Sequence, residues 1–345
     1  MKLLILTQKI DINDDVLGFF HGWVAEFAKH CEQVTVICLF QGEYDLPKNV
    51  KVLSLGKESS KCKLKYLFRF YKYIWQERKN YDSVFVHMNQ VYVVLGGLFW
   101  KAWHKKISLW YTHKQVSLNL RIAEKFVDNI FTASKESFRL ASDKVRVMGH
   151  GINIDIFRPL ENKSENSVFK ILTVGRISPI KDVKTLIRAV AELQITNYEL
   201  QIVGAAGTPE QEKYFQEVKE LVRDLKIEDK VKFIGSVPNR EVMRYYQNAD
   251  LFVNMAPTGG LDKAILEAMA CGLPVIVCNE TMKEDLRSAG YELIFKHGDF
   301  KQLSQKIDEI FRIDMDERKN LGEKLRLVVV NNHNLRNLIL NIISF

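Results

Sequence analysis

Short apolar runs alternate along the chain with stretches whose apolar residues recur at helical spacing. Runs of strand length that are bounded by polar residues or glycine are typical of buried parallel strands, and the longer stretches between them of helices that cover a sheet. The pattern predicts an α/β protein with two doubly wound parallel sheets. The expected strands are 2–6, 34–39, 50–55, 83–86, 107–111 and 129–132 in the first half, and 169–174, 199–203, 231–234, 251–253 and 274–277 in the second.

A polar stretch that contains one proline, 157–167, separates the two halves. Such composition is typical of a linker, and a length of 345 residues fits two domains of roughly 150 residues each. We expect a first domain over 1–160 and a second over 161–345, with the last helix free to pack back on the first. Because open parallel sheets bind ligands at the carboxyl ends of their strands, we expect two Rossmann-like domains that face each other across a cleft.

Composition excludes several classes of protein. Hydrophobic residues make up 47% of the chain and charged residues 27%, as in ordered globular proteins. Five cysteines without a CxxC pair argue against a disulfide framework or a structural zinc site. No apolar run reaches the ~18 residues of a membrane span, and the start of the chain lacks the apolar region of a secretory signal. We therefore expect a cytoplasmic protein.

Positive charge is concentrated in the first half. Residues 1–157 hold 23 Lys and Arg against 15 Asp and Glu, whereas residues 158–345 hold 27 of each kind. This asymmetry indicates that the first domain meets an anionic partner, such as a lipid surface, a phosphorylated acceptor or nucleic acid. Ordinary solvated lysines are the alternative.

The segment 57–79 carries much of this charge, with eight bases against Glu58 and Glu77, and it is interleaved with aromatic residues. Its spacing predicts an amphipathic helix with an aromatic face. The preferred interpretation packs this face on the sheet. The alternative rests it on an anionic membrane, with 100–106 extending the same surface. The residues of the face are Leu64, Phe68, Tyr71 and Trp75.

Two cations follow the first strand of the second half. Arg176 and Lys181 lie in the loop 175–181, directly before the helical stretch 183–193. A diphosphate that is bound without a metal ion needs charge-assisted donors, and Arg provides a bidentate fork whereas Lys provides a point charge. The loop therefore suits an anion, with a plain surface loop as the alternative.

A glycine pair, Gly259 and Gly260, precedes a short helix that ends at Gly272. The free N–H groups at the start of this helix favour phosphate or sugar oxygens. Lys263 and Glu267 are i and i+4 on the helix, so they form either a surface ion pair or a site in which Glu267 accepts both ribose hydroxyls.

These segments resemble the glycosyltransferases of family four of the sequence classification, which have the GT-B fold and are metal-independent and mostly retaining. The matching segments are Gly175-Arg176 with Lys181, the run 266–275, and 149–153 with 157–159. The resemblance implies transfer of a sugar, of hexosyltransferase type in class EC 2.4, from a UDP-, GDP- or ADP-sugar to a hydroxyl of a glycan, lipid-linked or small-molecule acceptor. It implies no cofactor and no metal, and a role in glycan biosynthesis. If the segment 57–79 rests on a membrane, we expect a peripheral position on the inner face of that membrane.

The resemblance also implies roles for single residues. Arg176 and Lys181 would bind the donor diphosphate and act in catalysis, Glu267 would bind the ribose, and His113 would lie beside the reacting sugar. The other implied donor-binding positions are Gly18, Val237, Gly259, Gly260, Leu261 and Lys263. One position departs from the family: the first acid of the E-x7-E motif falls at Gly259. Asp262 or Lys263 is the candidate substitute, and the sugar stays open.

Alternatives from other classes have weaker support. The missing acid at Gly259 motivates a non-catalytic GT-B protein that binds a nucleotide sugar and serves as a partner. Asp314-Met315-Asp316 has the form of a metal motif, but its place between C-terminal helices predicts a helix cap. The sequence contains no GxGxxG motif, so a dinucleotide-binding enzyme is not indicated. No known nucleic-acid-binding module accompanies the segment 57–79, so we expect no nucleic-acid partner.

Overall fold

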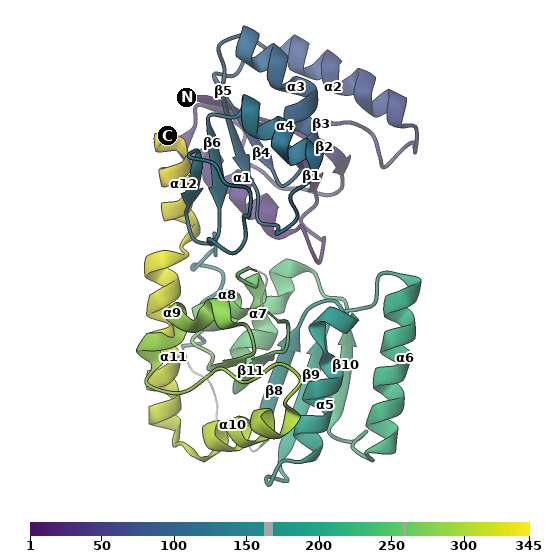
Figure 1. Cartoon of the computed structure of the whole chain (residues 1–345), viewed down its shortest axis with the longest axis vertical. Coiled ribbons are helices and arrows are strands. Elements are labelled where there is room, and N and C mark those ends of the chain that lie inside the picture. The colour runs from purple at the N-terminus through teal and green to yellow at the C-terminus, as the bar shows by residue number, and fades with distance from the viewer. Residues whose placement is uncertain (162–167, 258–259) are drawn as a thin grey trace. The chain divides into compact units, whose positions relative to one another are not determined.

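The computed structural model of the protein describes residues 1–161, 168–257 and 260–345 (Figure 1). The chain divides into two compact units, each built around its own parallel sheet. The first unit comprises Met1–Gly151, Pro238–Arg240 and Leu335–Phe345, and the second comprises Ile152–Val237 and Glu241–Asn334.

The first unit contains a seven-stranded sheet in the order β3-β2-β1-β4-β5-β6-β7. The chain winds outward in both directions from β1 and β4, as in doubly wound folds. The centre of the sheet is covered on both faces, which is why the run 3–6 in β1 is continuously apolar instead of alternating. The strands are β1 Lys2–Ile10, β2 Gln33–Gln41, β3 Val50–Ser54, β4 Ser83–His87, β5 Lys106–Trp110, β6 Asn129–Thr132 and β7 Val145–Val147.

The last helix of the chain belongs to the first unit, where α12 packs on α1. Gly151 makes this packing close, because a Cβ there would lie within 3 Å of side-chain atoms of Trp23, Leu335 and Leu338. Trp23 Nε1 donates a hydrogen bond of 3.2 Å to the Gly151 carbonyl. The helices of this unit are α1 Phe19–His30, α2 Lys63–Glu77, α3 Val91–Ala102, α4 Leu118–Phe126 and α12 Leu335–Ser344.

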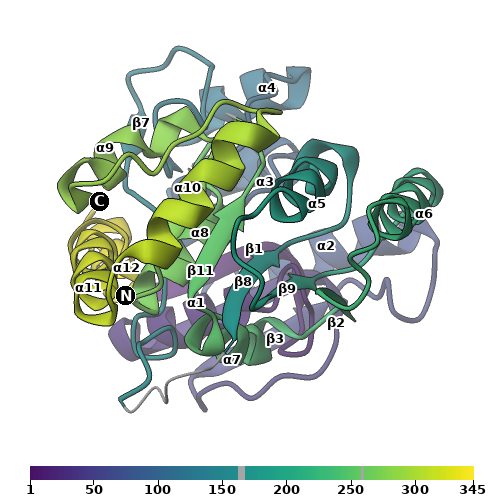
Figure 2. The same ribbon diagram turned by 90° about the horizontal axis from the view of Figure 1, so that it is seen from below.

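The second unit contains a five-stranded parallel sheet in the order β10-β9-β8-β11-β12, so the prediction of two parallel sheets is confirmed. Helix α5 lies between α10 and α6 on one face of this sheet (Figures 1 and 2). The strands are β8 Phe169–Val174, β9 Tyr198–Val203, β10 Val231–Gly235, β11 Leu251–Asn254 and β12 Val275–Val277. The helices are α5 Val183–Ala191, α6 Pro209–Asp224, α7 Asn239–Asn248, α8 Lys263–Ala270, α9 Lys283–Leu286, α10 Phe300–Arg312 and α11 Met315–Asn332, with 3₁₀ turns at Pro179–Lys181, Glu280–Met282 and Arg287–Ala289. The first two residues of α7 belong to the first unit.

Helix α2 corrects the preferred interpretation of the segment 57–79. Leu64, Phe68 and Trp75 of the predicted aromatic face are 77%, 71% and 54% exposed, whereas the buried apolar residues of the helix are Phe70 and Ile74. The helix carries apolar residues on two faces, and spacing alone does not say which of them covers the sheet. Neither α2 nor any other helix in the described ranges is long and apolar enough to cross a membrane.

The Asp-x-Asp sequence near the C-terminus has the capping role that its position predicts. Asp314 is the N-cap of α11, and its carboxylate accepts a hydrogen bond of 2.8 Å from the backbone N–H of Glu317. This bond satisfies one of the free N–H groups in the first turn of the helix. The capping prediction is therefore confirmed.

Candidate functional site

The candidate site lies at the carboxyl end of β8 in the second unit. Gly175 follows this strand with a φ of +146°, and Gly204 follows β9 with a φ of +140°. A Cβ on Gly204 would lie 2.0 Å from the carbonyl oxygen of Gly175, so the close approach of the two loops requires glycine at position 204. Arg176 follows directly and has an exposed side chain.

An ion pair between Lys181 and Asp262 connects the loop 175–181 with the start of α8. Lys181 ends the 3₁₀ turn after β8, and its ammonium pairs with Oδ2 of Asp262. Asn254, the last residue of β11, donates to the same oxygen at 3.0 Å. Oδ1 of Asp262 accepts from the backbone N–H of Ala264 at 3.2 Å, which caps α8. Asp262 therefore fixes both the start of α8 and the position of the lysine.

Two cations line one small recess at this edge of the sheet. Gly175, Arg176 and Lys181 form part of its wall, together with Asn254 and Met255. A guanidinium and an ammonium on the wall of one recess attract an anion that carries several negative charges, and the glycine at 175 lets such a ligand approach the backbone. Asp262 offsets part of the charge of Lys181, and Arg176 adds a second cation that a diphosphate can bind.

The charge of Lys181 affects the titration of Asp262. Burial alone would raise the pKa of Asp262, but the charge of Lys181 and the hydrogen bonds from Lys181, Asn254 and the N–H of Ala264 outweigh it, so the pKa lies below its ordinary value. A carboxylate of this kind stabilises the fold above its unfolded pKa of about 3.9. That stabilisation is lost as the pH falls from there through the lower folded pKa.

We expect Asp262→Asn to lower the free energy of unfolding by about 1–3 kcal/mol at pH 7, because the ammonium of Lys181 loses its charged partner. The difference between variant and parent should shrink as the pH falls below about 4, where the carboxylate of the parent becomes protonated. Thermal melts followed by circular dichroism between pH 7 and about 3 measure it. A difference that stays constant over this range would contradict the assigned role of the pair.

Glu267 is buried on α8, and both of its carboxylate oxygens have partners. Oε1 lies 2.9 Å from Nζ of Lys263, and Oε2 accepts a hydrogen bond of 3.1 Å from the hydroxyl of Tyr246. The side chains of Glu267 and Lys263 are 5% and 18% exposed, so the interpretation as a surface ion pair is wrong. Burial lowers the pKa of Lys263 although Glu267 opposes the shift, and burial with the charge of Glu267 raises the pKa of Tyr246.

Other predicted donor-binding residues lie near these two motifs in the sequence. Val237 follows β10 by two residues, and Leu261 packs against the core of the second unit. The carbonyl of Gly260 accepts a hydrogen bond of 2.8 Å from Nδ2 of Asn279, which holds the turn before α8. Gly259 lies outside the described residues.

Gly18 and His113 lie in the first unit. His113 is exposed three residues after β5, and its Nδ1 accepts a hydrogen bond of 3.0 Å from the backbone N–H of Gln115. Gly18 is buried directly before α1, where a Cβ would lie 2.3 Å from the carbonyl oxygen of Asp14. Local packing accounts for this glycine, and the donor-binding role of both residues stays a prediction.

Sequence reasoning missed Asn254 and Tyr246. Asn254 is the first polar residue after the apolar run 251–253, and Oδ1 also accepts from the N–H of Ala256 at 3.0 Å. A polar residue at the carboxyl end of a buried strand was the available signal. Tyr246 has no comparable signal, because only tertiary packing brings α7 next to Glu267.

Comparison with known proteins identifies a family for the second half. The family model "Glycosyl transferases group 1" matches residues 156–328, about half of the chain. The D-inositol 3-phosphate glycosyltransferase of Thermobispora bispora is 29% identical over 169 residues, which are 45% of this chain and 40% of that protein. The match thus spans about two fifths of the length of this relative.

Two solved structures are similar over nearly the whole chain. Anabaena Alr3699/HepE in complex with UDP has a TM-score of 0.78 at 19% identity, with 100% of this chain and 99% of that chain covered. A glycosyltransferase from Rickettsia africae has a TM-score of 0.79 at 17% identity, with 99% and 97% covered. Likeness at these identities shows the fold alone, and it confirms the predicted α/β GT-B fold class.

Proposed function

Since the chain belongs to the glycosyl transferases group 1 family, we propose that it moves a sugar from a nucleotide-diphosphate sugar to a hydroxyl acceptor, as a hexosyltransferase-type enzyme. The observation that carries this proposal is the recess at the end of β8, where Arg176 and Lys181 stand together. Two cations at a glycine-lined strand end suit a polyphosphate, because each can form a charge-assisted hydrogen bond to phosphate oxygens.

The second domain, 161–345, binds the donor in this proposal. Arg176 donates bidentate hydrogen bonds to the diphosphate, and Lys181 adds a point charge whose position is fixed by its ion pair with Asp262. Glu267, at the end of a buried network with Lys263 and Tyr246, accepts the ribose hydroxyls. The remaining donor contacts are assigned to Val237, Gly259, Gly260, Leu261 and Lys263.

The proposed reaction is catalysed by stabilisation of the negative charge that develops on the leaving group. As the bond between sugar and diphosphate breaks, negative charge grows on the departing phosphate oxygen. Arg176 and Lys181 neutralise this charge without a metal ion, and because Lys181 is held in advance, little reorganisation is needed at the moment of reaction. His113 positions the reacting sugar from the first domain, with Gly18 at the phosphate, and the configuration of the sugar is retained.

The first domain, 1–160, binds the acceptor in this proposal. The acceptor is a glycan or a lipid-linked molecule, and a phosphorylated acceptor of either kind would be attracted by the surplus of basic residues in this domain. The basic segments 57–79 and 100–106 meet an anionic membrane surface, so that a cytoplasmic enzyme works at the inner face of a membrane. Nucleic acid is not among the proposed partners.

A non-catalytic protein that binds a nucleotide sugar is the second candidate. It is favoured by a single observation, the glycine at 259, where the E-x7-E motif that the sequence resembles has its first acid. Asp262 is the substitute that an active enzyme would use for contact with the donor sugar, because its carboxylate pairs with Lys181, which lines the recess. Transfer of labelled sugar to an acceptor extract separates the two candidates, since the non-catalytic protein binds the donor without transfer.

We expect one nucleotide among UDP, GDP and ADP, with its sugars, to raise the melting temperature in the presence of EDTA. A ligand at one hundred times its dissociation constant adds ~2.7 kcal/mol to the free energy of unfolding. At about 2 °C per kcal/mol the shift amounts to roughly 5 °C. Differential scanning fluorimetry measures it. The absence of any shift would contradict the donor site, and a shift that needs added Mg²⁺ or Mn²⁺ would contradict the metal-independent mechanism.

A further inference from the structure

Helix α2 presents apolar side chains to solvent along one face. Leu64, Phe68, Tyr71 and Trp75 follow one another at steps of four, three and four residues, which place side chains on the same side of a helix, and Leu67 lies beside Phe68. Tyr71 is half-buried against the core of the first unit. Leu64 and Phe68 are more than two thirds exposed, and Trp75 more than half. Single exposed apolar residues are ordinary, but a contiguous row is typical of an interaction surface.

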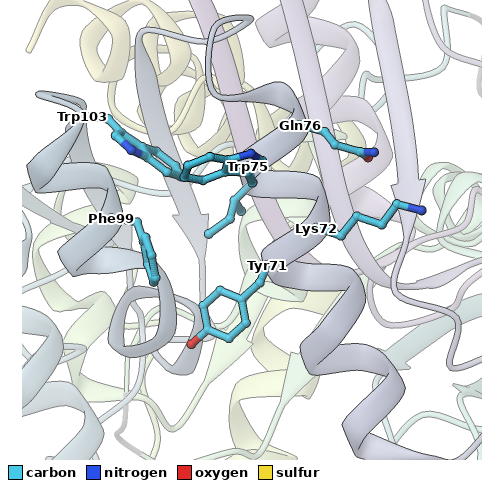
Figure 3. A pocket seen from close by; sticks show the side chains of 7 residues that line it. Tyr71, Lys72, Trp75, Gln76, Phe99 and Trp103 are labelled. Carbon is cyan, nitrogen blue, oxygen red and sulfur yellow. The ribbon is translucent and has the colours of Figure 1, made fainter.

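This row continues onto α3 through an aromatic pocket of about 480 Å³ (Figure 3). The rings of Trp75 and Trp103 lie 5.8 Å apart, and Phe99 lies 5.8 Å from Trp103 and 5.6 Å from Tyr71. Ring edges and faces therefore make up most of the wall. Figure 3 shows Lys72 extending from α2 on the side away from these rings. A pocket with such a wall suits a hydrocarbon chain and gives a polar ligand few partners.

Positive charges border the apolar row on one side of α2. Lys65 and Lys72 lie three residues before Phe68 and Trp75, respectively, and are exposed. The exposed Lys61 and Lys79 flank the helix at its two ends. The acid within the helix does not oppose them, because Glu77 is buried and pairs with Lys51 at 2.7 Å. Apolar side chains with cations beside them are typical of helices that lie in the interface of an anionic bilayer.

We propose that the α2 docking face, formed by Leu64, Phe68 and Trp75 with Lys65 and Lys72, binds an anionic lipid bilayer. Leu64, Phe68 and Trp75 enter the boundary between headgroups and acyl chains, the aromatic pocket takes a hydrocarbon chain, and the lysines contact headgroup phosphates. Tryptophan is favoured at this depth because its ring is apolar and its N–H is polar. Arg78, whose guanidinium lies 4.3 Å from the Trp75 ring, adds a cation at the same level.

Charge argues against a second copy of the chain as the occupant. In a two-fold symmetric contact the same patch meets itself, so the lysines of one copy would approach those of the other. Like charges brought together in this way oppose association, whereas anionic headgroups attract them. The inference rests on the proposed function for what the docked enzyme acts on, but lipid binding needs neither donor nor turnover.

Sedimentation with vesicles tests the docking. We expect the protein to bind vesicles that contain phosphatidylglycerol at low salt at least about tenfold more tightly than pure phosphatidylcholine, since each lysine near an anionic surface contributes about fivefold. Leu64→Ser/Phe68→Ser and Lys65→Glu/Lys72→Glu should each weaken binding by about tenfold or more. The fold should survive, because all four side chains are exposed.

Matched variants on other helices serve as controls. Leu327→Ser replaces a leucine of α11 that is 58% exposed, and Lys213→Glu reverses an exposed lysine of α6. Both should bind vesicles as the parent does. Failure of the parent to bind phosphatidylglycerol vesicles would overturn the proposal, and so would equal binding of the parent and Leu64→Ser/Phe68→Ser.

Quenching by brominated acyl chains tests insertion. Trp23, Trp100 and Trp110 are fully buried, so Trp75 and Trp103 should account for any quenching by brominated phosphatidylglycerol. Vesicle binding without quenching would overturn insertion. A doubled molar mass in light scattering that Leu64→Ser/Phe68→Ser abolishes would assign the face to a second copy. Because the nucleotide-induced thermal shift is measured without lipid, its loss would count against the proposed function and leave the vesicle result standing.

Discussion

Arg176→Ala should lower kcat by about 10²–10³ while the fold and the melting temperature stay those of the parent. The guanidinium is exposed and lines the recess at the end of β8, so its removal leaves the core untouched. What the variant loses is a preorganised donor for the charge on the departing diphosphate, and loss of one such donor typically has an effect of this size. Initial rates of nucleoside diphosphate release with acceptor extract measure it.

Two further variants sharpen this test. Arg188→Ala removes an exposed arginine of α5 and should keep full activity. Arg176→Lys keeps the charge but not the bidentate fork, so its rate should fall between those of Arg176→Ala and the parent. Near-normal turnover of Arg176→Ala would mean that the diphosphate is bound elsewhere, and the assignment of the recess would then fail.

Glu267→Ala should be the most destabilising of the substitutions considered, with a loss of about 3–5 kcal/mol in the free energy of unfolding. The substitution removes the carboxylate that faces the ammonium of Lys263 and accepts from the hydroxyl of Tyr246, in a place where water cannot fully replace it. At about 2–4 °C per kcal/mol the melting temperature should fall by roughly 6–20 °C. Thermal and urea unfolding monitored by circular dichroism measure the loss.

A double variant separates the effect of the unpaired Lys263 cation from the effect of the space left by the Glu267 side chain. Lys263→Met/Glu267→Ala removes the buried cation together with its partner, so it should recover part of the stability that Glu267→Ala loses. It should not recover the nucleotide-induced thermal shift, since the acceptor for the ribose hydroxyls is still absent. Glu220→Ala, on the exposed side of α6, is the matched control. Equal stability of Glu267→Ala and the parent would contradict the buried ion pair.

The bounds of a strand could be predicted from the sequence where buried apolar residues mark its position. β6 and β8 have the predicted bounds, because each contains a pair of adjacent buried apolar residues, Ile130-Phe131 in β6 and Ile171-Leu172 in β8, that marks the strand in the sequence. β1 extends beyond its apolar run to Ile10, since its partner β2 continues alongside it and pairs Lys9 with Phe40. The short β7 was missed because three residues carry no periodic signal.

The candidate site could be predicted from the sequence only where its residues lie within one local motif. Arg176, Lys181 and Glu267 follow from local patterns, but the pair between Lys181 and Asp262 joins residues 81 positions apart, which spacing cannot indicate. The sequence also did not indicate which side chains of α8 and α2 are buried. Lys263 and Glu267 have the same i,i+4 spacing on a surface and in a core, and the two apolar faces of α2 have the same period.

The return of α12 to α1 makes the first unit discontinuous in the sequence. The buried residues Leu335, Leu338 and Ile342 of this helix complete a hydrophobic surface whose other half, around Trp23, is encoded more than three hundred positions earlier. A gene fragment that stops near the middle of the chain therefore encodes an incomplete module. Exchange of the first unit between related proteins, by recombination or by design, has to carry both ends of the reading frame together.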